Sequence, residues 1–184
     1  MEFGKIIKTF KSKKGNEVIL RYPREEDLEE MLSYVNELIK DDTFVLISGK
    51  PQTKEDEKKF LTQLLKNMQR GDVLSLVIEQ SGKIIGMTGV TREKFRMRHV
   101  GMLGISLSAQ VRGEGIGTMA FATIIEESKK MGLRLLTLHC FENNSRALHM
   151  YEKFGFVRVG MIPKAVLFRE KYIGQIIMYL PLVK

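Results

Sequence analysis

The stretch Gln110-Val-Arg-Gly-Glu-Gly-Ile-Gly-Thr118 is the most informative segment of this chain. An apolar, strand-like segment, 100–107, precedes it, and an amphipathic helical pattern, 119–131, follows it. The three glycines let the backbone turn tightly and approach a ligand closely. The free N–H groups and positive end of the following helix suit a pyrophosphate, and Arg112 adds a positive charge at the entrance. The stretch therefore predicts a phosphate-binding turn between a strand and a helix.

Two other glycine-rich turns fit this stretch less well. A P-loop ends in Gly-Lys-Ser or Gly-Lys-Thr, and no such ending follows Gly117. A dinucleotide fingerprint is spaced G-x-G-x-x-G, whereas the spacing here is G-x-G-x-G and lies in mid-chain. A tight turn that binds nothing remains as the structural alternative.

A second block, from Asn144 to Phe156, reads Asn-Ser-Arg-Ala-Leu-His-Met-Tyr-Glu-Lys-Phe-Gly-Phe. Together with residues 110–117 it resembles the GNAT superfamily of acetyl-CoA-dependent N-acetyltransferases. Motif A of that family runs R/Q-x-x-G-x-G/A, and its motif B runs N-x-x-A-x-x-x-Y-E-K-x-G-F. The two blocks stand in the family's order, about one helix and one strand apart. The resemblance covers roughly residues 18–180, and its detailed matches lie in the second half.

Hydrophobic periodicity predicts the order β-α-α-β-β-β-α-β-α-β-β. The expected strands are 18–22, 73–79, 83–91, 99–108, 133–141, 156–162 and 172–180, and the expected helices are 25–40, 53–70, 115–131 and 144–154. The pattern supports one α/β or α+β domain over residues 1–184. The resemblance implies a GNAT-like mixed, mostly antiparallel central sheet flanked by helices, splayed at the acetyl-CoA site. Residues 11–15 are expected to form an exposed turn.

Composition excludes several classes of protein. No apolar run reaches membrane-spanning length, and residues 1–14 lack the apolar core of a signal peptide, so no membrane partner is expected. A single cysteine, Cys140, rules out an internal disulfide framework and fits a reducing cytoplasm. The net charge of +8 is spread among acidic residues, which favours a solvated surface over a nucleic-acid role. Part of the excess charge would face the phosphates of coenzyme A.

Acetyl transfer to an amine requires a base for the amine proton and an acid for the leaving thiolate. A phenol is protonated at pH 7 and can donate to a thiolate. The resemblance puts Tyr151 where many family members have this general acid. The alternative is an aromatic ring packed on the helix. Cys140 lies in an apolar strand and is interpreted as a small buried hydrophobe.

The general base is less evident from the sequence. Many family members carry a Glu on the strand before motif A, where this chain has Met102. Some relatives, including ribosomal-protein alanine acetyltransferases, carry a Glu five residues before the motif B Asn, where this chain has His139. A neutral imidazole is a plausible base near pH 7, although a lone strand histidine is more often structural. Glu142 acting through a water, or ordered waters alone, are the other candidates.

The resemblance implies that the two motifs and the strand before them bind acetyl-CoA, without a metal. Backbone groups of the strand would bind pantetheine as an added strand would. The motif B Asn would both cap its helix and bond the pantetheine arm. The implied residues are Ile105, Ser106, Leu107, Arg112, Gly113, Glu114, Gly115, Ile116, Gly117, Thr118, Asn144, Tyr151 and Lys153.

The resemblance also implies that residues 41–44 and 168–173 choose the acceptor, which could be a protein N-terminus, an amino acid, a polyamine or an aminoglycoside. Asp41 and Asp42 could attract a cationic amine or could simply be the polar end of a helix. A possible homodimer is expected because many relatives are dimers. The alternative functions are a non-catalytic acyl-CoA-binding or sensor module, motivated by Met102, and a nucleic-acid-binding protein, motivated by charge alone.

Overall fold

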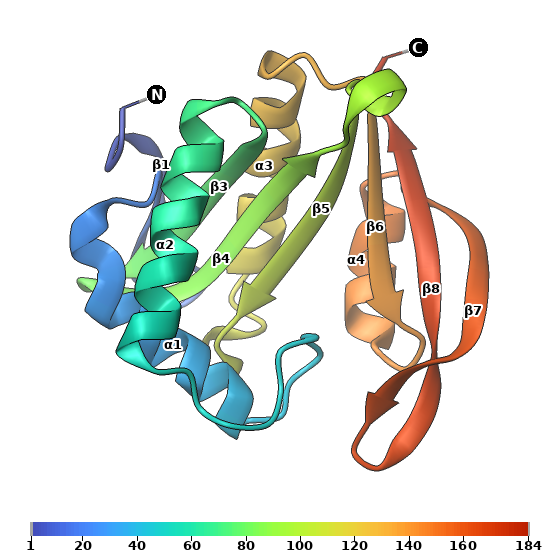
Figure 1. Cartoon of the computed structure of the whole chain (residues 1–184), viewed down its shortest axis with the longest axis horizontal. Coiled ribbons are helices and arrows are strands. Elements are labelled where there is room, and N and C mark those ends of the chain that lie inside the picture. The colour runs from blue at the N-terminus through green and yellow to red at the C-terminus, as the bar shows by residue number, and fades with distance from the viewer. Residues whose placement is uncertain (1, 184) are drawn as a thin grey trace.

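The computed structural model describes residues 2–183, and an open sheet runs through the whole of it (Figure 1). Besides three short 3-10 turns, the elements follow in the order β1 (Ile6–Lys11), β2 (Glu17–Arg21), α1 (Leu28–Lys40), α2 (Lys54–Gln69), β3 (Val73–Gln80), β4 (Lys83–Arg92), β5 (Val100–Leu107), α3 (Ile116–Lys130), β6 (Leu135–Phe141), α4 (Ser145–Lys153), β7 (Val157–Phe168) and β8 (Lys171–Pro181). The predicted order is confirmed from its first strand onward, and β1 is an addition at the start.

The eight strands lie in the order β1-β2-β3-β4-β5-β6-β8-β7. Every neighbouring pair is antiparallel except β5 and β6, which run parallel. The predicted mixed, mostly antiparallel sheet is therefore confirmed.

The parallel pair is short. Residues 100–102 of β5 pair with residues 135–137 of β6, and no further pairs follow within the described chain. Beyond that point β5 remains paired with β4, and β6 remains paired with β8, so the two strands diverge (Figure 1). The implied splay of the sheet lies after Met102 and Thr137.

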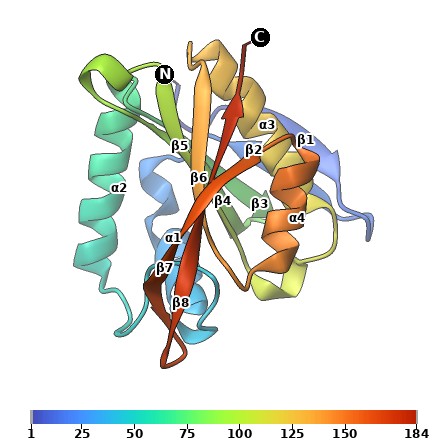
Figure 2. The ribbon, with the colours of Figure 1, turned by 90° about the vertical axis from the view of Figure 1, so that its right-hand side faces the viewer.

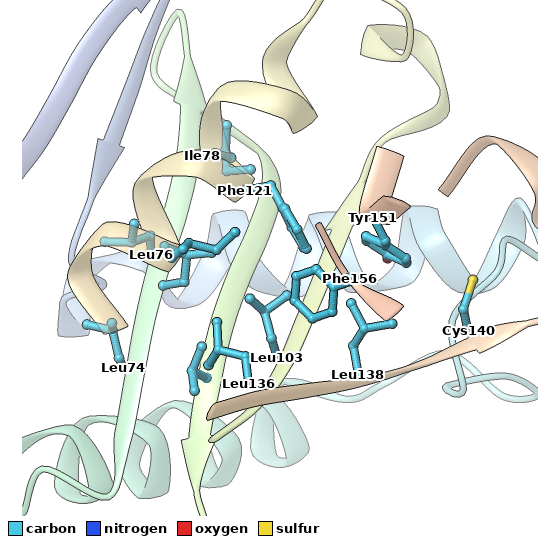
Figure 3. Close-up of a cluster of buried hydrophobic side chains, with 14 of the residues drawn as sticks. Leu74, Leu76, Ile78, Leu103, Phe121, Leu136, Leu138, Cys140, Tyr151 and Phe156 are labelled. Atoms are coloured by element: carbon cyan, nitrogen blue, oxygen red, sulfur yellow. The ribbon is translucent and has the colours of Figure 1, made fainter. Parts of the chain in front are cut away.

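Helices cover both faces of the sheet (Figures 1 and 2). Alternate residues of β3 show which helices cover each face. Leu74, Leu76 and Ile78 belong to a buried cluster with α3 and α4, whereas Val77 belongs to a cluster with α1 and α2. Phe121 of α3 is fully buried at the centre of the first cluster (Figure 3). Each strand side chain can therefore be assigned to an α1/α2 face or an α3/α4 face.

Capping motifs fix several helix ends where the sequence predicts them. The Thr53 side chain accepts a hydrogen bond from the Asp56 N–H at the start of α2, and the Asp56 carboxylate accepts one from the Thr53 N–H. The Asn144 side chain accepts from the Ala147 N–H at the start of α4. Gly71 and Gly155 have positive φ just past their helices.

The N-terminal prediction was incomplete. Residues 6–11 form β1, an edge strand that pairs with β2 and has no fully buried residue. Its side chains therefore lack the strong alternation that marks a half-buried strand. The segment 11–15 does turn, but Ser12 is buried, so the expectation of an exposed turn was wrong at that residue.

The closing strands are longer than predicted. β7 extends to Phe168 and β8 begins at Lys171, so residues 168–173 form the tip of a hairpin. Pro163 and the positive-φ Lys164 lie at a register shift in the middle of β7. Proline cannot donate to a ladder, and the prediction ended the strand there.

Candidate functional site

The glycine stretch forms a turn between β5 and α3. Gly113 and Gly115 have φ values of 92° and 82°, in the left-handed region that glycine adopts readily. Gly115 is the N-cap of α3, and among residues 2–183 no side chain caps that helix. The first N–H groups of α3 are consequently available to an anion at the positive end of the helix. The predicted turn between a strand and a helix is confirmed, and its binding of a phosphate stays a prediction.

Two arginines lie at this turn, Arg112 within it and Arg146 on α4. The Arg112 guanidinium donates to the Leu107 carbonyl at the end of β5, at 3.1 Å. Arg146, in the first turn of α4, lies so close to Gly113 that a Cβ there would stand 3.1 Å from Nη2 of its guanidinium. Lys153, the expected phosphate contact, lies at the other end of α4. Arg146 was missed because only the contact between the turn and α4 reveals it.

The diverging part of β5 has one unpaired edge. From Leu103 to Leu107 its backbone is paired with β4 on one side, and no partner strand in the described chain lies on the other. The side chains of Ile105 and Leu107 pack on the α3/α4 core, as expected. The free N–H and C=O groups are thus the part of this strand that can bind an extended amide-containing ligand.

The predicted alternation along β6 is confirmed. Leu136, Leu138 and Cys140 are buried in the α3/α4 core, and His139 is exposed on the opposite face. Tyr151 packs in the same α3/α4 core. The two expected catalytic side chains therefore approach the divergence of β5 and β6 from opposite faces of the sheet.

Tyr151 is a buried residue of α4, with its ring centroid 5.1 Å from that of Phe121 (Figure 3). Burial raises the pKa of the Tyr151 phenol well above its usual value, and the neighbouring Cys140 thiolate would raise it further. Burial likewise raises the pKa of Cys140 to about 11. Both groups are neutral and protonated at pH 7.

The family's usual position for the base and the candidate Glu142 lie on or near the α1/α2 face. Met102 of β5 is exposed there, and it has no group that accepts a proton. Glu142 follows β6 directly, and its Oε1 accepts a hydrogen bond from the Gly174 N–H at 2.7 Å. That bond ties Glu142 to β8, whereas the exposed His139 side chain makes no hydrogen bond within residues 2–183.

A polar group from α1 adjoins the same part of β5. The buried Tyr34 hydroxyl donates to Ser106 Oγ at 2.8 Å. Burial raises the pKa of Tyr34 far above its usual value, the Ser106 bond opposes that shift, and the nearby Glu37 carboxylate adds to it. Oε1 of Glu37 is buried and has no hydrogen-bond partner within residues 2–183. Sequence reasoning missed Tyr34 and Glu37 because α1 carries no motif.

The two segments expected to select the acceptor contact each other. Phe44, from the loop between α1 and α2, stacks on Phe168 with centroids 5.1 Å apart and meets Phe141 edge-on at 6.0 Å. Asp42 Oδ2 lies 3.1 Å from Arg169 Nε. Asp42 is therefore engaged by the β7–β8 hairpin, while Asp41 is exposed without an ion pair of its own among the described residues.

Within residues 2–183, no group of three or more His, Cys, Asp and Glu side chains is arranged to hold a metal ion. In the same part of the chain, no helix combines the length and the apolar character needed to cross a membrane.

Comparison with known proteins agrees with this geometry. The model of the acetyltransferase (GNAT) family matches residues 32–156. The N-acetyltransferase YdgE of Bacillus subtilis, itself described as uncharacterised, is 36% identical over 50 residues. That match takes in 27% of this chain and 32% of YdgE, so it spans about a third of that relative.

Solved structures share the whole fold. A GNAT-family acetyltransferase from Streptococcus pneumoniae superposes with a TM-score of 0.79 at 25% identity, over 89% of this chain and 99% of that one. The structure of yncA from Salmonella typhimurium with its cofactor acetyl-CoA has a TM-score of 0.78 at 15% identity, over 91% and 95% of the two chains.

Proposed function

Because this chain belongs to the acetyltransferase (GNAT) family, we propose that it transfers an acetyl group from acetyl-CoA to a primary amine by direct attack, with Tyr151 as general acid. The observation that carries the proposal is the free edge of β5 leading into the uncapped start of α3. One part suits an extended pantetheine arm, and the other suits a pyrophosphate. A single domain over residues 1–184 and a cytoplasmic location, suggested by the lone Cys140, accompany this proposal.

The residues of the site fit acetyl-CoA as the acyl donor. A side chain at position 113 would contact Arg146, and Gly113 avoids that contact. The N–H groups at the start of α3 face the same turn. Asn144, which caps α4, stands where the family bonds the pantetheine arm. The similar fold of the Salmonella protein, solved with acetyl-CoA, supports the same assignment.

Acetyl-CoA supplies a thioester carbonyl carbon for the amine nitrogen to attack and a sulfur that leaves as a thiolate. Tyr151 holds its proton at neutral pH because of burial, and it donates that proton to the sulfur as the carbon–sulfur bond breaks. His139 accepts the proton that the nitrogen releases as the carbon–nitrogen bond forms. The acid and the base act from the two faces that their strands and helices fix.

The acceptor approaches from the α1/α2 face. His139 and Met102 are exposed there. A protein N-terminus and a small-molecule amine both satisfy this chemistry. A homodimer remains a prediction.

The proposal is tested by following thiol release from acetyl-CoA with N-terminal peptides, amino acids, polyamines and aminoglycosides. Turnover with one class should fall about 100-fold or more in Tyr151→Phe, because removing a general acid has an effect of that order. The variant should still bind acetyl-CoA and melt near the wild-type temperature. Full activity in Tyr151→Phe would remove Tyr151 from the mechanism.

A second candidate function is a non-catalytic acyl-CoA-binding module. Met102, which cannot act as a base, is the observation that favours it. Such a module would show acetyl-CoA raising the melting temperature without turnover of any amine. Turnover that depends on Tyr151 would exclude it.

A further inference from the structure

The turn between β1 and β2 packs on the glycine turn. Ser12 Oγ donates to Glu114 Oε2 at 3.0 Å, and Lys14 Nζ lies 2.8 Å from Glu114 Oε1. The Lys13 N–H donates to the Glu114 carbonyl at 2.9 Å. Every acceptor oxygen of Glu114 is therefore bound by three consecutive residues of the N-terminal hairpin, about a hundred positions away in the sequence.

Glu114 lies where the glycine turn passes into α3. It lies between the two left-handed glycines of the turn, and its side chain is 5% exposed. The aliphatic part of Lys13 covers Gly115, since a Cβ there would stand 3.6 Å from Lys13 Cγ. The hairpin thus contacts both Glu114 and the N-cap of α3, where the turn passes into the helix.

A carboxylate at this point poses an electrostatic problem. Lys14 and the Ser12 hydroxyl lower the pKa of Glu114, which keeps it ionised at neutral pH. An ionised carboxylate beside an anion-binding helix start would repel a phosphate ligand unless a cation offsets it. Lys14 supplies that cation and Ser12 holds the other carboxylate oxygen, while the Lys13 N–H holds the backbone carbonyl of Glu114.

We propose that Ser12 and Lys14 are positioning residues of the coenzyme A site, which act through Glu114 to neutralise and shape the phosphate-binding turn. This inference rests on the proposed function, because it assumes that the turn binds the pyrophosphate of coenzyme A. Neither residue touches the reacting atoms. Their effect should be confined to ligands that carry the phosphates.

The test measures coenzyme A affinity by calorimetry in Lys14→Met, Glu114→Gln and the double variant. Lys14→Met should bind coenzyme A about tenfold more weakly, the order expected for an uncompensated charge at a helix start. Adding Glu114→Gln should restore the affinity, because no carboxylate then needs a cation. Turnover of acetyl-pantetheine, which lacks the phosphates, should be unchanged by Lys14→Met.

Lys11→Met is the matched control, because Lys11 is exposed beside the same turn and makes no hydrogen bond or ion pair with Glu114 in the described chain. Equal losses in the Lys11 and Lys14 variants would overturn the inference in favour of general charge attraction. A double variant no better than Lys14→Met would overturn it in favour of direct contact between Lys14 and phosphate. Failure of the wild type to bind coenzyme A would instead reject the proposed function.

Discussion

The proposed acid, Tyr151, and the proposed base, His139, lie on opposite faces of β6. The α3/α4 face of β6 buries Cys140 against Tyr151, where a low dielectric keeps a phenol protonated. The opposite face leaves His139 exposed to solvent, where the proposed mechanism brings the amine. Because alternate strand residues point to opposite faces, an acid and a base can be kept apart until a thioester lies between them.

Cys140 should resist thiol reagents while the protein is folded. Its pKa of about 11, against 9.0 for a free thiol, leaves about 100-fold less thiolate at pH 8, and its 5% exposure slows attack further. Reaction with a chromogenic disulfide should be slow in buffer and rapid in denaturant. Complete labelling of the native protein within the mixing time would contradict the burial of this strand.

The raised pKa of Cys140 also makes the free energy of unfolding depend on pH in the alkaline range. The folded thiol titrates at a higher pH than the unfolded one, so its contribution is intact below pH 9.0 and is lost as the pH rises through about 11. The free energy of unfolding should therefore fall more steeply over this window in the wild type than in Cys140→Ala. Parallel curves for the two proteins, obtained from denaturant titrations, would show that Cys140 is not the group responsible.

Two glycines of β5 should respond differently to alanine. A Cβ on Gly101 would overlap Val90 and stand 2.7 Å from Leu133 Cδ1, whereas a Cβ on Gly104 meets nothing within 4 Å. Gly101→Ala should lower the free energy of unfolding by about 1–3 kcal/mol, the usual effect of overpacking. Gly104→Ala should leave it nearly unchanged. Urea midpoints measure both, and equal losses would mean that the core does not constrain Gly101.

Among the helices and strands, α2 begins with a capping box whose contribution to stability can be measured. Thr53→Ala removes the side chain that accepts from Asp56 N–H and should cost about 1 kcal/mol. Thr62→Ala, an exposed change inside the same helix, should cost nothing, since alanine favours helix. Thermal melts of the two variants give the comparison, and a smaller loss for Thr53 than for Thr62 would contradict the capping role.

The contribution of this cap to stability also depends on pH. The Thr53 side-chain hydrogen bond lowers the pKa of Asp56 below its ordinary 3.8, so this contribution is present above pH 3.8 and disappears as the pH falls through the lower folded value. The difference between wild type and Thr53→Ala should shrink in acid accordingly.

The sequence predicted most elements because their signals are local. The alternation of Leu136, Leu138 and Cys140 and the cap at Asn144 depend on neighbours within a few residues. The contacts between Ser12 and Glu114 and between Tyr34 and Ser106 span 102 and 72 positions. Periodicity tells which face of an element is buried, but not which distant segment covers it. The sequence therefore predicted the two motifs, but not the residues of distant segments that contact the site.

At the scale of the whole molecule, the two halves of the sheet share little backbone pairing. Only residues 100–102 and 135–137 join β5 to β6 within the described chain, whereas β6 and β8 pair from Leu135 to Phe141. The α3/α4 core spans the junction on one face. On the other face, the contacts of Phe44 and Asp42 with the β7–β8 hairpin reach from one half to the other.

Phe44 should therefore affect the acceptor side without disturbing the donor side. Phe44→Ala removes the stacking on Phe168 and the edge contact with Phe141, and such pairs contribute about 0.5–1.5 kcal/mol each. We expect faster amide hydrogen exchange at residues 169–173 and a severalfold higher KM for the acceptor. The KM for acetyl-CoA should change little, because Phe44 lies on the face opposite α3 and α4.

Phe60→Ala provides the control for Phe44, because Phe60 is an exposed aromatic residue of α2 and makes no ring contact with the hairpin in the described chain. It should leave both KM values and the exchange rates of residues 169–173 unchanged. If Phe44→Ala also leaves exchange at the hairpin unchanged, the aromatic contact does not hold the halves together. If exchange rises while the acceptor KM stays constant, the contact stabilises the hairpin but takes no part in acceptor binding.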